Sequence, residues 1–209
     1  MSDSLPARAY FLACDPDGGP VSRRPRAALL VRAAAVTDLV LRGNLRDQRG
    51  HAEPTGAAPT GDLLLDDLLA DLRAHRPASW RALLRRGKND TLQSLETQLS
   101  AAGLLEEGSS SILRRKVLVP SDPARVRDAH ARLDHALTAP LSEVDASDAA
   151  LAALAGASGA GMSRSDARRH SGRLKELEKL AGPVVPALRK AVAGRRAARI
   201  AAFSGGSGG

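Results

Sequence analysis

The chain has a single cysteine, Cys14, and aromatic residues make up only 2% of its 209 residues. One cysteine excludes an internal disulfide framework and any zinc site built from several cysteines. Because aromatic side chains are scarce, alanine, leucine and valine must supply the core of a chain that is 43% hydrophobic. The same scarcity excludes aromatic stacking on bases as the main way of binding nucleic acid.

The sequence also lacks a targeting segment and a long uninterrupted apolar run. Residues 1–6 carry no basic region of the kind that opens a signal peptide. The first long apolar stretch, residues 27–41, is shorter than the ~20 residues that cross a bilayer. It is interrupted by Arg32, Thr37 and Asp38. We therefore expect a cytoplasmic protein that does not span a membrane, and the pattern leaves open whether it lies on one.

Positive charge is in excess, and the length suits one domain. Lysine and arginine total 31 against 23 aspartate and glutamate, a net charge of +8, which favours an anionic partner. Domains usually have ~100–200 residues, so we expect a single domain over residues 1–203. Residues 204–209 contain only glycine and serine, and we interpret them as a flexible tail.

The hydrophobic periodicity predicts a mainly α fold. Residues 149–157 are apolar on every side, which is typical of a helix in the middle of a structure. Residues 48–58 are polar and rich in glycine and proline, and they predict a loop. Asn89 or Asp90 is the expected cap of the helix that follows it. Helices are predicted over residues 27–41, 62–76, 79–86, 89–103, 121–137, 149–157, 164–180 and 184–203, the last one broken at Gly194.

One β-hairpin is predicted among the helices. The sequence pattern of a hairpin consists of the apolar pair Leu104 and Leu105, a serine-rich turn at residues 108–111 and a second strand at residues 112–119. Apolar residues of the second strand surround a basic cluster at residues 114–116. Such a hairpin is suited to shallow insertion into lipid or to pairing with another subunit, and the alternative is packing against its own helix.

Four segments, in this order, resemble the Golgi phosphoprotein 3 family, including its bacterial members. The best match is Pro-Thr-Gly-Asp at residues 59–62, ahead of a leucine-rich helix. The likeness extends over residues 10–203. The other matching segments are residues 38–45, 99–105 and 154–158.

The resemblance implies a helical bundle around a buried central helix, plus one hairpin through which family members associate, here residues 104–119. It also implies a peripheral membrane protein that binds phosphatidylinositol 4-phosphate in a basic pocket. That pocket uses a tryptophan before the first long helix, an arginine on that helix and a pair of arginines on the helix before the hairpin. The corresponding residues here are Arg23, Arg32, Asn89 and Leu92, so only the helix arginine is kept.

Basic residues next to these positions suggest a replacement pocket for an anionic headgroup. A guanidinium at Arg32, at the edge of an apolar helix face, needs a partner because burying an unpaired charge is costly. The alternatives are an ion pair with Asp66 or Asp67, snorkelling to water, or a solvated basic surface. The candidate headgroup ligands are Arg23, Arg24, Arg32, Arg85, Arg86 and Lys88.

Other functions have weaker support in the sequence. The 89–103 helix and the hairpin have the order of a winged-helix nucleic-acid binder, but that helix shows no basic residue on its outer face. His130 and His135 are five residues apart and do not share a helix face for a metal. No nucleophile–base pair or phosphate-binding glycine loop is visible. We expect neither an enzyme nor a cofactor, and we expect Trp80 to anchor its helix in the core rather than to sit at a lipid interface.

Overall fold

The computed structural model describes residues 4–109 and 116–204, and these fold mainly into α-helices, as the sequence predicts. The helices are α1 (Leu5–Ala13), α2 (Arg24–Leu41), α3 (Leu63–Ala74), α4 (Trp80–Arg85), α5 (Lys88–Ala101), α6 (Ala124–Thr138), α7 (Ala146–Ser158), α8 (Arg164–Arg169), α9 (Ser171–Ala181) and α10 (Val184–Ser204), with a short 3-10 turn at Leu141–Glu143.

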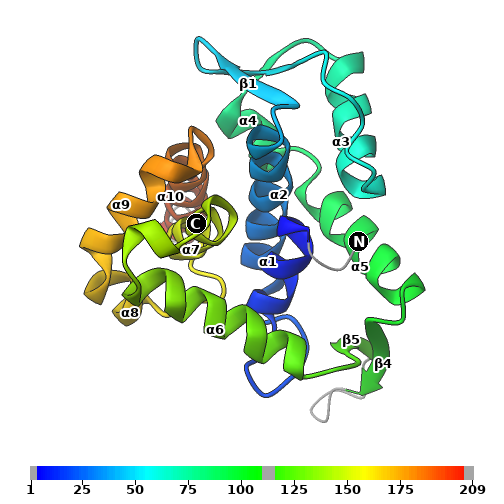
Figure 1. Cartoon of the computed structure of the whole chain (residues 1–209), viewed down its shortest axis with the longest axis vertical. Helices are drawn as coiled ribbons and strands as arrows, with labels where there is room; N and C mark the ends of the chain where they lie inside the picture. Colours follow the sequence, from blue (N-terminus) through cyan, green and yellow to red (C-terminus); the bar gives the residue numbers. More distant parts are fainter. Residues whose placement is uncertain (1–3, 110–115, 205–209) are drawn as a thin grey trace.

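Two helices form the centre of the bundle. Helix α2 is buried from Ala27 to Leu39 and packs against α1, α3, α4, α5, α7 and α10. Helix α7 lies against α2 and is itself covered by α6, α9 and α10. The predicted burial is confirmed for residues 149–155, whereas Gly156 and Ala157 are partly exposed. Figure 1 shows α2 running through the middle, with α3 and α5 on one side and α7, α9 and α10 on the other.

Helix α1 is the element that the sequence pattern does not identify. Almost every residue of α1 is buried, so the helix has no polar face and produces no amphipathic signal. Its first turn is fixed by the Leu5 N–H, which donates to Oδ2 of Asp38 at 2.9 Å. The other oxygen of Asp38 accepts from Arg42 at 2.7 Å. Asp38 thus connects α1 to the C-terminal end of α2.

The Pro-Thr-Gly-Asp segment is a helix-start motif. Asp62 caps α3 by accepting from the Leu65 N–H at 3.2 Å. Asp66, one turn later, accepts from the Thr60 N–H at 2.7 Å and from the Gly61 N–H at 3.1 Å. These hydrogen bonds hold the turn before α3 in place. The polar residues of the segment therefore have a structural role that needs no ligand to explain it.

The predicted loop at residues 48–58 is wrong in its first half. Strands β1 (Leu45–Gln48) and β2 (His51–Pro54) form an antiparallel hairpin, and β3 (Ala78–Ser79) pairs with β2. The turn residues Arg49 and Gly50 both have positive φ, 51° and 85°, as a two-residue hairpin turn requires. These strands are polar and mostly exposed, so they lack the alternation that identifies a strand from sequence.

The predicted hairpin is confirmed as strands β4 (Leu105–Ser109) and β5 (Lys116–Pro120), paired from Leu105↔Pro120 to Ser109↔Lys116. The predicted turn at residues 108–111 is wrong in its first half, because Gly108 and Ser109 continue β4 and pair with Val117 and Lys116. Residues 110–111 and the start of the second strand at residues 112–115 lie outside the described residues.

Two predicted helix details are wrong. Helix α5 starts at Lys88, after Gly87, and not behind a cap at Asn89 or Asp90. Helix α10 continues through Gly194, where a Cβ atom would come within 2.7 Å of the Arg81 guanidinium. The glycine there gives room to α4 instead of ending the helix. Among the described helices, none is both long enough and apolar enough to cross a membrane.

Candidate functional site

The connection between α4 and α5 gathers basic side chains around one cavity. Arg85, Arg86 and Lys88, which we call with Gly87 the basic junction, line a cavity of about 470 Å³ together with Leu29 and Ala82. Arg86 lies 3.4 Å from a carboxylate oxygen of Asp71, and both side chains are about half exposed. Arg85 and Lys88 form no ion pair with any described residue. The polar lining of this cavity is therefore entirely cationic.

The start of α5 adds backbone donors at the same place. Gly87 precedes the helix in a left-handed conformation, φ 65°, that favours glycine, and it provides no side-chain cap. The first N–H groups of a helix have no partner within the helix, and the helix dipole makes this end positive. The basic junction therefore places side-chain cations next to a helix N-terminus that has no side-chain cap. Gly87, Asp90 and Thr91 of that N-terminus line a second cavity, described below, so we do not assign its N–H groups to the cationic one.

Arg32 holds the basic junction against α2. Its side chain is 5% exposed and donates from Nε to the Leu83 carbonyl oxygen at 3.3 Å and from Nη1 to Oγ1 of Thr91 at 2.9 Å. Thr91 in turn donates to the Gly87 carbonyl oxygen at 2.8 Å. One guanidinium thus connects the end of α4 to the first turn of α5.

Burial sets the electrostatics of Arg32. Loss of water around the guanidinium lowers its pKa from 12.5 to about 10, with Asp71 opposing the shift. The alternative of an ion pair with Asp66 or Asp67 is not seen among the described residues, and Asp66 instead accepts from the backbone of Thr60 and Gly61. Arg32 relies on hydrogen bonds that it donates to neutral oxygens.

A second cavity, of about 340 Å³, lies beside the first on the other side of Arg86. Arg32 and Arg86 line it, but so do Asp67, Asp71 and Asp90. Its carboxylates outnumber its cations, so an anionic group is favoured in the first cavity and not in this one. Arg32 reaches only this second, acidic cavity.

Arg24, another predicted headgroup ligand, has a different partner. Its guanidinium makes two hydrogen bonds to the Glu96 carboxylate, at 2.6 and 2.5 Å, and Glu96 is 5% exposed. The hydrogen bond to Glu96 raises the pKa of Arg24, and the Tyr10 hydroxyl donates to the same carboxylate at 3.4 Å. The charge of Arg24 is therefore balanced inside the fold.

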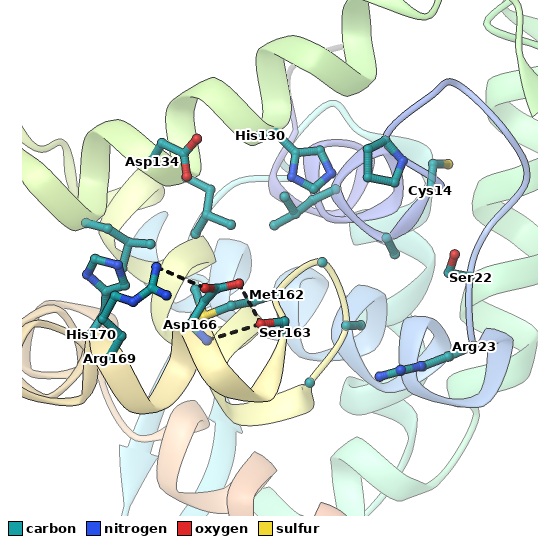
Figure 2. Close-up of a pocket in the computed structure, with 18 residues that line it drawn as sticks. Cys14, Ser22, Arg23, His130, Asp134, Met162, Ser163, Asp166, Arg169 and His170 are labelled. Carbon is teal, nitrogen blue, oxygen red and sulfur yellow. Dashed lines mark hydrogen bonds and ion pairs between the residues drawn. The ribbon is translucent and has the colours of Figure 1, made fainter.

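Arg23 lies with Arg24 at the start of α2, about 12 Å of helix rise from Arg32. It lines a third cavity, which shares no residue with the two beside the basic junction (Figure 2). The structure thus brings Arg32, Arg85, Arg86 and Lys88 together and places Arg23 and Arg24 elsewhere.

Three other candidates from the sequence are buried. Trp80 is 5% exposed, and its indole N–H donates to Asp47, so the prediction that it anchors α4 in the core is confirmed. Cys14 is 3% exposed, and burial raises the pKa of its thiol to about 12. Leu92, at one of the family-pocket positions, is 1% exposed and points away from water. Within residues 4–109 and 116–204, no cluster of histidine, cysteine and acidic residues could hold a metal ion.

Sequence reasoning missed the residues that shape the basic junction. Leu83 contributes only a backbone oxygen, and Thr91 looks like any polar residue of an amphipathic helix. The one available signal is Gly87 within Arg85-Arg86-Gly87-Lys88, since a glycine among cations before a helix is a common site of positive φ.

Comparisons with known proteins agree with the resemblance seen in the sequence. The family model described as Golgi phosphoprotein 3 (GPP34) matches residues 5–194. A comparison with curated proteins found no match.

Proposed function

This chain belongs to the Golgi phosphoprotein 3 family, and from that premise we propose that it is a peripheral membrane protein that binds an anionic phospholipid headgroup at the basic junction. By family resemblance the headgroup is phosphatidylinositol 4-phosphate. The observation that carries the proposal is the cavity whose polar lining consists of Arg85, Arg86 and Lys88. Its volume of about 470 Å³ falls in the range typical of small-ligand sites.

The chemistry of this lining suits a phosphate group. Arginine binds phosphate through two parallel hydrogen bonds, and lysine supplies a compact point charge. Each basic residue near an anionic membrane surface contributes roughly 1 kcal/mol, so the side chains of the basic junction suffice for reversible attachment. Their position differs from the family pattern, in which the pair of arginines would fall at Asn89 and Leu92. Leu92 faces the core, and of the cations here Arg85 and Arg86 precede α5 and Lys88 is its first residue.

Arg32 enters the proposal as a positioning residue. Because its hydrogen bonds end on Leu83 and Thr91, it fixes the relative placement of α4 and α5 and hence the spacing of the cations between them. It lines the acidic neighbouring cavity and not the basic one, so we assign it no direct contact with the headgroup.

The exposed face of α5 argues against the winged-helix alternative. The outward residues along its middle are Gln93, Ser94 and Thr97, none of which is basic. A recognition helix needs side chains that reach phosphates and base edges in the major groove, and arginine and lysine make most of those contacts. We therefore favour a lipid surface. Self-association through the 104–119 hairpin and the absence of catalysis stay predictions.

Vesicle sedimentation tests the proposed function. Vesicles of phosphatidylcholine alone, with phosphatidylglycerol, or with phosphatidylinositol 4-phosphate are mixed with the protein and with the double variant Arg85→Gln/Lys88→Gln. Removing two cations at roughly 1 kcal/mol each should weaken binding to anionic vesicles about thirtyfold. The control Arg127→Gln/Lys175→Gln removes the same charge from exposed positions on α6 and α9 and should weaken binding much less.

Equal losses in the two double variants would mean that net charge, and not the basic junction, attracts the protein. Binding to duplex DNA in a gel shift, without binding to any anionic vesicle, would overturn the lipid proposal in favour of the nucleic-acid one.

A further inference from the structure

The largest of the cavities described here lies apart from the basic junction. Its volume is about 610 Å³, and it is enclosed by the end of α1, the start of α2, helix α6 and the connection from α7 to α8. Leu12, Leu133 and Met162 give it an apolar lining. A concave, partly apolar site of this volume with a few polar groups is typical of small-molecule binding.

The wall formed by the α7–α8 connection is held in place. Gly161 has φ 72°, and a Cβ atom there would lie 2.5 Å from Cγ and 2.7 Å from the carbonyl oxygen of Leu12. Arg26 donates to the Gly159 carbonyl oxygen at 3.2 Å and fastens the same segment to α2. The cavity therefore exists before any ligand binds, which reduces the entropic cost of binding.

Two opposite charges in the lining, both on exposed side chains, form no ion pair among the described residues. Arg23 comes from the start of α2 and Asp134 from α6, and Figure 2 shows them on different sides of the cavity. They do not form an ion pair with each other or with another described side chain. The remaining charged pair in the lining, Arg169 and Asp166, lies 3.5 Å apart and is internally balanced. One charge of each sign therefore remains without an ion pair among the described residues, and the carboxylate of Asp134 acts electrostatically on His130.

A neutral polar group lies on the same wall as Asp134. The imidazole of His130, one helical turn before Asp134, lines the cavity, and its Nε2 atom is buried with no hydrogen-bond partner among the described residues. Burial lowers the pKa of His130 below its usual value, so the ring is neutral near pH 7 and can donate one hydrogen bond and accept another. A buried polar atom without a partner is costly to a fold unless something else satisfies it.

We propose that this cavity binds a small zwitterion, with an acidic group at Arg23, an ammonium group at Asp134 and an apolar chain between them. The charges match one to one, and the leucine and methionine side chains suit the chain. A ligand with a single charge would leave either Arg23 or Asp134 unmatched. The proposal is independent of the headgroup site, because the two cavities share no residue.

Calorimetric titration with matched probes tests it. The probes have similar chains and differ in charge: ω-aminooctanoate carries both charges, octanoate only the negative one and octylamine only the positive one. We expect ω-aminooctanoate to bind roughly tenfold more tightly than either singly charged probe. Aminohexanoate and aminododecanoate, with the amino group also at the chain end, vary the distance between the two charges. Binding to vesicles that contain phosphatidylethanolamine would indicate that the zwitterion is a lipid headgroup instead of a free molecule.

Single substitutions separate binding from folding. Arg23→Gln should bring the affinity for ω-aminooctanoate down to that for octylamine, and Asp134→Asn should bring it down to that for octanoate. The controls Arg127→Gln and Glu143→Gln remove equivalent charges from exposed positions outside the lining and should change no affinity. The proposal is overturned if no zwitterion binds, if the three octyl probes bind equally, or if each substitution weakens all three alike. None of these outcomes bears on vesicle sedimentation.

Discussion

Substitution of Arg32 by methionine should separate the stability of the fold from the shape of the basic junction. The lowered pKa, from 12.5 to about 10, corresponds to roughly 3 kcal/mol against the buried charge. Each of the two hydrogen bonds from Arg32 to Leu83 and Thr91 returns about 1.5–3 kcal/mol. Methionine removes both terms, keeps most of the apolar stem and leaves the Leu83 carbonyl oxygen unpaired, at about 1–3 kcal/mol.

Together these figures leave a net loss of about 1–6 kcal/mol, so we expect the free energy of unfolding to fall by an amount in that range. For a chain of this length, each kcal/mol corresponds to about 2–4 °C in melting temperature. The change should also be visible locally, because α4 and α5 lose the guanidinium that connects them. Amide hydrogen exchange at residues 85–91 should accelerate, and binding to anionic vesicles should weaken.

Arg32→Lys distinguishes positioning from charge. Lysine keeps the positive charge but cannot donate in two fixed directions, so we expect it to behave like methionine in hydrogen exchange. Vesicle binding lost without faster exchange at residues 85–91 would show that Arg32 contacts the headgroup directly. Unchanged binding with unchanged exchange would refute the positioning role altogether.

Three further outcomes follow from buried groups elsewhere. Arg24→Gln leaves the Glu96 carboxylate buried without its ion-pair partner, so it should lower the free energy of unfolding by about 1–3 kcal/mol. The loss should be near the lower figure because the Arg24 side chain is about half exposed. An unchanged midpoint of chemical denaturation would contradict this. Folding lowers the pKa of His130, so its contribution to stability is full above about pH 6.5 and is lost as the pH falls through the pKa of the folded state. The variant His130→Leu has no such group, and between pH 7 and 5 it should therefore lose less stability than the parent protein. Cys14, with its pKa raised to about 12, should resist iodoacetamide at pH 8 until denaturant is added, and rapid alkylation of the native protein would contradict its burial.

The bundle could be predicted from the sequence wherever the helices are amphipathic or wholly apolar at length. Helix α3 has leucines on one face and a capping aspartate, and α7 is apolar on every side, so both are evident. Helix α1 is short and buried and has no polar face to mark its period. Strands β1 and β2 are exposed, polar and held by a turn at Arg49 and Gly50, so neither hydrophobic alternation nor composition identifies them.

The candidate site was predictable only in part, for a physical reason. Sequence patterns show that a cation is present but not which oxygen it faces. Arg85 and Lys88 are only three residues apart in the chain and so lie in the same short connection, whereas the partner of Arg24 is Glu96, 72 residues away. That pairing depends on α5 lying against α2, which only the tertiary fold reveals.

The arginines at the start and in the middle of helix α2 have different interactions. Near its start, Arg24 neutralises a buried acid, and Arg23, beside a cavity, forms no ion pair with any residue that the structure describes. Farther along, Arg32 forms no ion pair with a described residue and donates to oxygens of the two helices that flank the basic junction. The carboxylates of Asp71 and Asp90 line the same cavity and favour its charge from a distance, without a hydrogen bond to it. Keeping an unpaired arginine inside the bundle costs stability, and the structure places that cost where it keeps the exposed cations of the basic junction in register.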